Sequence, residues 1–144
     1  MKRFKQILAV VDPRQPPDMV LERAVSLAQN NQASLTVVAV APRMTAGIGM
    51  PDGGPISAQL QEAAIADSRQ QLENAVAPFR TRFAINVKVL MGTVFLEIIR
   101  EVLRHDHDLV IRTPEDPAWL ARLFGSDDMH LLRKCPCPVW LVKH

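Results

Sequence analysis

The chain has 144 residues, a mass of 16.1 kDa and a formal net charge of +2, and this length favours one domain that spans 1–144. Its composition, 48% hydrophobic and 22% charged, excludes a disordered or collagen-like chain. Lys and Arg are scattered along the sequence, so we expect no nucleic-acid partner. The first apolar run, Ile7 to Val11, is shorter than a signal-peptide core, and no run reaches the roughly 20 apolar residues of a membrane span. We therefore expect a cytoplasmic protein without a membrane partner.

The first third of the chain predicts a strand, a helix and a second strand. The run KQILAVVD at 5–12 is a short buried strand with Asp12 at its carboxyl end. Asp18 is placed to cap a helix that ends in QNNQ. The β-branched run SLTVVAVAP at 34–42 predicts a second buried strand.

A long loop and a long helix follow. The segment RMTAGIGMPDGGPI at 43–56 holds four glycines and two prolines, which are incompatible with regular structure and typical of a lid or binding loop. From Ser57 to about Phe79, apolar residues recur at helical spacing. They are Leu60, Ala64, Ile65, Leu72, Ala75, Val76 and Phe79.

The second half continues the alternation of strands and helices. INVKVL at 85–90 predicts a third strand near an edge, DLVI at 108–111 a fourth, and PVWLV at 138–142 a fifth. Between the third and fourth, Thr93 can cap a helix whose buried face would hold Phe95, Ile98, Ile99, Val102 and Leu103. Short helices are expected at DPAWLARLF and SDDMHLLRK.

This order predicts an α/β fold, a mostly parallel sheet with helices on both faces. Ligands of such sheets bind outside the carboxyl ends of the strands. The segments to inspect are therefore those around Asp12, Val40, Gly92 and Arg112.

Several segments together resemble the universal stress protein family over nearly the whole chain. They are the first strand with Asp12, MGTVFLEIIREV, HDHDLVI and the closing LFGSDDMHLLRKCPCPVWLV. The resemblance implies a flavodoxin-like or Rossmann-like sheet of five parallel strands, a role in stress response, and dimerisation through the last strand. The altered loop after the fourth strand is similar to that of the tandem-domain branch of the family, whereas we expect one domain here.

The same resemblance bears on nucleotide binding. ATP-binding members carry a glycine, two residues, a second glycine, nine residues and then Gly-Ser or Gly-Thr. Gly125 and Ser126 match the final pair, but Arg112 and Glu115 stand where the earlier glycines would be. Glycine there lets backbone N–H groups approach an anion at positive φ, so we expect a degenerate nucleotide site.

Acidic residues strengthen this expectation. A carboxylate about 5 Å from a phosphate charge costs roughly 3 kcal/mol at an effective dielectric of 20. These residues also have roles without any ligand, because Asp116 fits a helix cap and Asp127 and Asp128 fit the first turn of a helix begun by Ser126. The carboxylates near the expected phosphate position are Glu115, Asp116, Asp127 and Asp128, against Arg112 and Arg122.

The alternative is a sensor that binds ATP or ADP with magnesium. In that hypothesis the glycine-rich loop 47–54 closes over the ligand, and slow hydrolysis through carboxylate-held magnesium stays open. The residues that would hold the nucleotide are Asp12, Val40, Gly92, Gly125 and Ser126.

No other motif predicts catalysis or a metal site. HDHD at 105–108 is interpreted as a solvated corner between helix and strand, and Cys135 and Cys137 as core or turn cysteines without redox or zinc spacing. His130 lies one helical turn after Ser126 and fits a packing role. We expect no enzyme, no catalytic residue and no bound metal, and we require no cofactor.

The last strand predicts the mode of association. If it lies at the edge of the sheet, a second subunit would cover its large apolar side chains, giving a homodimer; the competing interpretation is that the long helix covers them. The expected interface residues are Val139, Trp140, Leu141 and Val142. We thus expect a stress-response domain that acts by association, with an unidentified protein partner.

Overall fold

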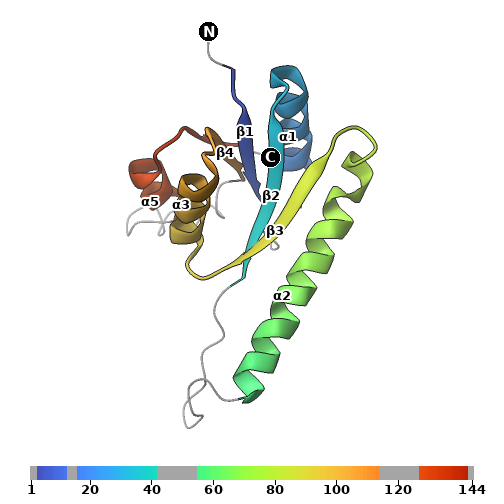
Figure 1. Cartoon of the computed structure of the whole chain (residues 1–144), viewed down its shortest axis with the longest axis vertical. Coiled ribbons are helices and arrows are strands. Elements are labelled where there is room, and N and C mark those ends of the chain that lie inside the picture. Colours follow the sequence, from blue (N-terminus) through green and yellow to red (C-terminus); the bar gives the residue numbers. More distant parts are fainter. Residues whose placement is uncertain (1–2, 13–15, 42–54, 114–126, 143–144) are drawn as a thin grey trace.

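The computed structural model describes residues 3–12, 16–41, 55–113 and 127–142. They form one parallel sheet of five strands with helices on both faces (Figure 1). The strand order is β3-β2-β1-β4-β5, the order of the first five strands of a Rossmann fold and not that of flavodoxin. The strands are β1 Gln6–Val10, β2 Ser34–Ala41, β3 Ile85–Met91, β4 Leu109–Arg112 and β5 Val139–Leu141.

The helices of the described segments follow the predicted alternation. α1 and α2 cover one face of the sheet, and α3 and α5 cover the other (Figure 1). Their bounds are α1 Asp18–Asn31, α2 Pro55–Val76 with the short 3-10 turn η1 Ala77–Phe79, α3 Val94–His105 and α5 Asp127–Lys134.

The central strands have continuous apolar sequences because both of their faces are buried. In β1, Ile7 and Ala9 pack into the core beneath α1 and α2, while Leu8 and Val10 pack into the core beneath α3 and α5. β1 lies between β2 and β4 and pairs with both. Burying one such aliphatic side chain contributes about 1.5–3 kcal/mol, so this strand is the centre of the fold.

Helix starts differ from the sequence prediction. Asp18 is the first residue of α1, and Pro17 holds the N-cap position without any side-chain cap. The prediction that Asp18 caps this helix is therefore wrong, although its carboxylate still lies in the first turn, where the helix dipole favours negative charge. Thr93 does occupy the N-cap position of α3, but its side chain makes no cap hydrogen bond.

The long helix α2 extends beyond the sheet at its amino-terminal end (Figure 1). Leu72 and Val76, in its last turns, are buried, whereas Leu60 is 52% exposed. On α3, Leu103 is 64% exposed, so its predicted place on the buried face is also wrong. The apolar pattern identified both helices but overestimated how much of each is covered.

The two edges of the sheet are β3 and β5. This confirms the expected edge position of the third strand. α2 packs on β2 and β3, at the opposite end of the sheet from β5. The long helix therefore does not cover the last strand. Within the described segments, no helix is long and apolar enough to cross a membrane.

Candidate functional site

The candidate site lies at the carboxyl ends of β1 and β4, where the strand order reverses direction. The chain runs outward from β1 through β2 to β3 and then crosses back to β4 and β5. Such a switch point is where ligands bind in open parallel sheets. Asp12, half-buried, follows β1, and Val11 extends the ladder through its N–H to the Val38 carbonyl at 2.8 Å.

The neighbouring strand ends bring Val40 and Gly92 to the same edge. Val40 pairs with Leu90 in the β2–β3 register, and the Gly92 N–H donates to the Ala41 carbonyl at 3.0 Å. Gly92 has φ of 140°, a conformation that is essentially restricted to glycine. Asp12, Val40 and Gly92 are thus brought to three adjacent strand ends, as the sequence predicts.

Glu97 fills the open side of Gly92. A Cβ atom at position 92 would lie 2.8 Å from Glu97 Oε1. The same carboxylate oxygen accepts from Arg100 Nη1 at 2.7 Å. Gly92 therefore makes room for the Glu97 side chain, whose carboxylate lies beside the strand ends.

Arg112, at the first glycine position of the family pattern, belongs to β4 itself. It pairs with Val10 on one side and Leu141 on the other, and its carbonyl accepts from the Val142 N–H at 2.8 Å. Its side chain is 3% exposed, and that of Thr113 is 5% exposed. Arg112 is therefore held inside the sheet as a buried strand residue and does not begin a loop.

Other predicted site residues lie outside the described segments. This holds for Gly125 and Ser126, for Glu115 and Asp116, and for the glycine-rich loop 47–54. Asp127 and Asp128 open α5, which confirms the second of the two short helices.

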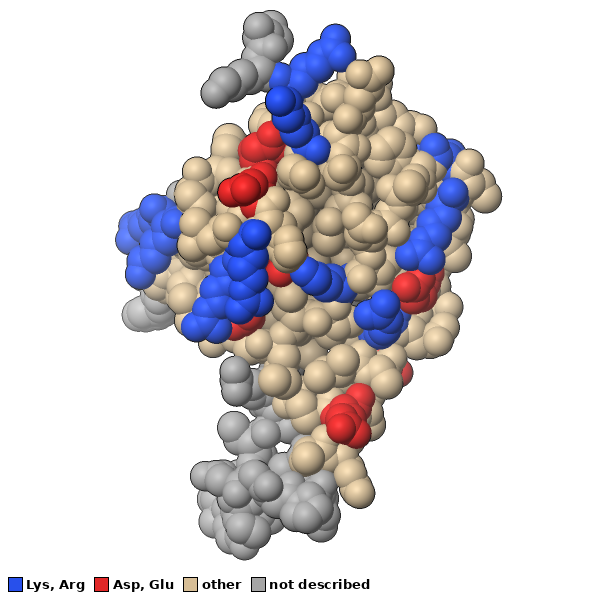
Figure 2. Space-filling model, viewed as in Figure 1, with Lys and Arg blue, Asp and Glu red and all other residues tan. Residues whose placement is uncertain are grey.

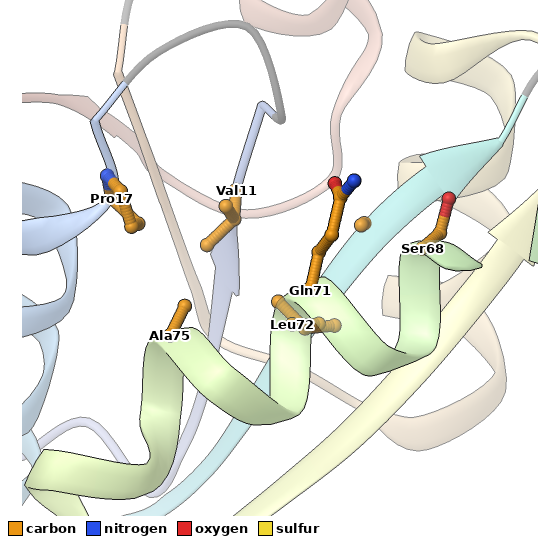
Figure 3. A pocket seen from close by; sticks show the side chains of 7 residues that line it. Val11, Pro17, Ser68, Gln71, Leu72 and Ala75 are labelled. Carbon is orange, nitrogen blue, oxygen red and sulfur yellow. The ribbon is translucent and has the colours of Figure 1, made fainter. Parts of the chain in front are cut away.

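A small cavity lies beside the same strand ends, on the face covered by α1 and α2. Its volume is about 160 Å³. Val11, Leu72 and Ala75 supply its apolar walls, while Ser68 and Gln71 carry the polar atoms (Figure 3). The full lining is Val11, Pro17, Ala39, Ser68, Gln71, Leu72 and Ala75.

Sequence reasoning missed the contribution of α2 to this cavity. The available signal was the position of Ser68 in the apolar stripe of the helix, four residues before Leu72. A small polar residue at such a position leaves space and a hydroxyl group where the helix meets the sheet.

The HDHD corner is not simply solvated, which corrects the sequence interpretation. Asp108 accepts the N–H groups of Lys5 at 2.8 Å and Gln6 at 3.0 Å, and so attaches the start of β1. His107 is 5% exposed, and neither ring nitrogen has a hydrogen-bond partner in the described part of the chain. Burial lowers the pKa of His107, and the nearby Glu101 carboxylate partly opposes that shift.

An ion pair between a buried carboxylate and a partly exposed lysine lies next to this histidine. Glu101 on α3 is 2% exposed and accepts from Lys88 Nζ of β3 at 2.7 Å. His105 Nε2 lies 3.1 Å from the same Nζ and 3.5 Å from Glu101 Oε1. Among the described residues, no group of three or more metal-ligating side chains is present.

His130 and the two cysteines take packing positions. The His130 ring on α5 stacks on Phe95 of α3 with a centroid distance of 4.7 Å. Cys135 and Cys137 are half-buried free thiols in the turn between α5 and β5. They contact the core beneath α3 and α5.

The residues predicted for the dimer interface differ in exposure. Trp140, in β5, is 46% exposed. Val139 and Leu141 are half-buried, and Val139 packs against the core beneath α3 and α5. Val142 is 8% exposed and belongs to the core beneath α1 and α2, so Trp140 presents most of the apolar side-chain surface of this edge.

Together the strand order and the switch point define a Rossmann-like α/β domain, a class of fold in which ligands bind at this edge of the sheet. The chain belongs to the Universal stress protein family, whose sequence profile matches residues 3–143.

Two curated relatives are Universal stress protein E of Escherichia coli strain K12 and of Photorhabdus laumondii. The first is 34% identical over 153 residues and the second 32% identical over 149 residues; each match covers 99% of this chain. Each match covers only 46% of the relative's own length. The chain therefore spans about half the length of these tandem-domain proteins.

Solved structures confirm the fold. Universal stress protein UspA from Lactobacillus plantarum superposes with a TM-score of 0.80 at 22% identity, covering 99% of both chains. A universal stress protein in complex with cAMP gives 0.71 at 14% identity over 99% of this chain and 98% of the other. One from Archaeoglobus fulgidus in complex with dAMP gives 0.64 at 19% identity over 99% and 100%.

Proposed function

We propose that this protein is a cytoplasmic stress-response domain that acts by association and not by catalysis, with a degenerate nucleotide site. The observation that carries this proposal is the position of Arg112. A glycine in the family pattern would open a phosphate loop, whereas Arg112 is a buried strand residue that pairs with Val10 and Leu141. Close approach of the backbone to an anion needs a flexible residue with free N–H groups.

Glu97 supports the same proposal electrostatically. Its carboxylate lies against Gly92 at the carboxyl edge of the sheet. A phosphate charge about 5 Å from one carboxylate meets roughly 3 kcal/mol of repulsion at an effective dielectric of 20, which corresponds to about a hundredfold loss of affinity. Arg100 pairs with Glu97 and reduces this repulsion, so the net loss is smaller.

The exposed edge at β5 supports association. Trp140 is 46% exposed on a strand at the edge of the described sheet. Tryptophan is among the side chains that dominate the energy of protein interfaces. We propose that a second copy of the chain covers this edge and that the dimer presents a surface to a further protein partner.

Nucleic acid is not part of this proposal. On the face shown in Figure 2, Lys and Arg side chains are dispersed, and acidic side chains lie beside several of them. Binding to a nucleic-acid backbone relies on clustered basic residues that neutralise several phosphates. The groups of basic side chains on this face are separate and do not join into one continuous stripe.

The second candidate function is an adenine-nucleotide sensor, which the cavity at Val11 and Ala39 favours. Its volume of about 160 Å³ is similar to that of an apolar cavity known to hold benzene, about 150 Å³. One aromatic ring of a base fits this volume, so a purine would enter it in part. Two relatives solved with cAMP and with dAMP support this alternative. In this hypothesis Asp12 and Val40 lie near the ligand, and ATP or ADP binds with magnesium.

Isothermal titration with ATP and with ADP, each with and without magnesium, separates the two functions. The degenerate site predicts no binding below millimolar concentrations. Micromolar binding that is weakened by Ala39→Leu, which fills the cavity, would overturn this proposal in favour of the sensor. Glu62→Gln, an exposed position on α2, is the matched control and should change nothing. Magnesium-dependent phosphate release measured in the same samples would instead indicate a slow hydrolase.

Light scattering coupled to size exclusion tests the association. The wild-type chain should elute as a dimer, Trp140→Lys as a monomer, and Leu103→Lys as a dimer. Leu103 is a matched control because it is an exposed large apolar residue, 64% exposed, on α3 and not on β5. A monomeric wild type, or equal disruption by both variants, would contradict association through this edge.

A further inference from the structure

The turn between α5 and β5 holds two thiols side by side. Cys135 Sγ and Cys137 Sγ are 3.7 Å apart and in hydrogen-bond contact. Both cysteines are free and half-buried. The thiols are therefore close to each other and still reachable by a small solute.

Both ends of this turn are attached to regular structure. The Cys135 N–H donates to the Leu131 carbonyl of α5 at 2.9 Å, and the Pro138 carbonyl accepts from Val110 of β4 at 3.0 Å. Pro136, between the cysteines, has a fixed φ. The proximity of the thiols is thus built into the backbone.

The two sulfurs differ in their surroundings. The hydrogen-bond contact with the Cys137 thiol and the backbone N–H of Cys137 lower the pKa of Cys135 from 9.0 to about 7, against the opposing effect of burial. Cys137 has the opposite environment, because its pKa is raised by the Cys135 sulfur, by burial and by the Asp108 carboxylate. This difference favours Cys135 as the nucleophile of the pair and Cys137 as the thiol that keeps its proton.

We propose that Cys135 and Cys137 are a modification site, a dithiol that a hydroperoxide oxidises to an intramolecular disulfide. A disulfide requires an S–S distance of about 2.05 Å and Cα atoms about 4.4–6.8 Å apart. Residues two apart in a chain are at most about 7 Å apart at their Cα atoms. The sulfurs, 3.7 Å apart, thus need rotation of the side chains and only a small adjustment of the turn.

The oxidation takes two steps. First, the Cys135 thiolate attacks one oxygen of the hydroperoxide; an S–O bond forms, the O–O bond breaks, and the other oxygen leaves as an alcohol after taking a proton. Second, the Cys137 sulfur attacks the sulfur of the Cys135 sulfenic acid; the S–S bond forms, the S–O bond breaks, and hydroxide leaves as water with the proton of Cys137. Overall two thiols lose two electrons to the peroxide, which is reduced to one alcohol and one water, or to two waters when it is hydrogen peroxide.

Intact-mass spectrometry of the whole reduced chain, treated with stoichiometric hydrogen peroxide, tests the proposal without any mutation. The expected product is a single chain that has lost two hydrogens and has no titratable thiol. Persistence of both thiols under these conditions would overturn the proposal. So would a disulfide found only between two chains on a non-reducing gel.

Two matched variants test the different roles of the cysteines. Cys137→Ser keeps a hydroxyl donor for Cys135 but cannot complete the disulfide, so dimedone should trap a sulfenic acid at Cys135. Cys135→Ser should give little dimedone adduct at Cys137. Equal trapping in the two variants would contradict the assignment of Cys135 as the nucleophile.

Alkylation with iodoacetamide at pH 7 measures the same difference. A thiol with a pKa near 7 has about fifty times more thiolate at that pH than one near 9, and its lower intrinsic nucleophilicity reduces the advantage to roughly five- to eightfold. Cys135 in the Cys137→Ser variant should react faster than Cys137 in the Cys135→Ser variant by at least this factor. Equal rates would overturn the roles of the two cysteines.

Discussion

Gly92 links backbone conformation to the candidate site. Its φ of 140°, together with the 2.8 Å that would separate an added Cβ atom from Glu97 Oε1, predicts that Gly92→Ala destabilises the fold. The strained backbone alone costs about 1–3 kcal/mol. Urea unfolding of the purified chain, followed by circular dichroism, measures the loss.

A double-mutant cycle separates strain from steric contact at this position. In a Glu97→Ala background, Gly92→Ala should still cause most of the loss of unfolding free energy that it causes in the wild-type chain. The backbone strain persists when the neighbouring carboxylate is gone. A cost that falls to zero in that background would show that the contact with Glu97, and not backbone conformation, selects glycine.

His107 predicts a pH-dependent stability. Its folded-state pKa lies below its ordinary value of 6.5, mainly because the ring is buried. As pH falls below about 6.5, the unfolded chain takes up the proton first, so the free energy of unfolding decreases, by at most about 1.4 kcal/mol per pH unit. The loss is complete once the pH is below the folded-state pKa.

The charged groups around His107 suggest the control variant for this pH experiment. Glu101 favours the protonated ring, whereas His105 and Lys88 oppose it. Urea unfolding at several values between about pH 7.5 and 5.5 should show the decrease in wild type and in His105→Gln but a shallower one in His107→Leu. The same pH dependence in all three chains would refute a role for His107.

At the scale of single residues, the sequence predicted where a residue lies along a strand better than it predicted the burial and hydrogen bonds of its side chain. Asp12, Val40 and Gly92 lie at the expected strand ends because strand boundaries follow from apolar runs. The burial of His107 was not predictable, because it depends on β1 and α3, which lie far apart in the sequence. The attachment of Asp108 to Lys5 and Gln6 spans more than a hundred residues, beyond any local pattern.

At the scale of elements, α2 shows how packing limits an amphipathic pattern. Leu72 is 2% exposed and lines the cavity, whereas Leu60 is 52% exposed. Leu72→Ala should therefore cost about 2–5 kcal/mol of unfolding free energy, and Leu60→Ala less than about 0.5 kcal/mol. Urea unfolding of both variants provides the comparison, in which each serves as the control for the other. Similar losses would mean that another surface covers the amino-terminal half of α2.

The elements themselves were largely predictable. All five strands appear within one or two residues of their predicted ranges, because apolar β-branched runs bounded by turn residues define them locally. The cap of α1 was wrong because Pro17, with its fixed φ, takes the N-cap position and leaves Asp18 inside the helix. The strand order needed the structure, since local patterns do not state which strands are neighbours.

At the scale of the whole molecule, the sheet is protected differently at its two edges. α2 packs against β3. At the other edge, β5 presents Trp140, and no described helix covers β5 as fully as α2 covers β3. An edge with a large apolar side chain favours association. In a dimer formed there, folding and association are thermodynamically linked, so stability depends on protein concentration.

This linkage gives a prediction that does not depend on the intrinsic effect of a mutation. Across about a hundredfold range of concentration, the thermal midpoint of the wild-type chain should rise. That of Trp140→Lys should stay constant, even though the loss of a half-packed tryptophan lowers it at every concentration. Leu103→Lys, on α3, should keep the wild-type slope. Differential scanning calorimetry measures all three chains, and a wild-type midpoint that does not change with concentration would mean that the β5 edge is covered by something other than a second copy of this chain.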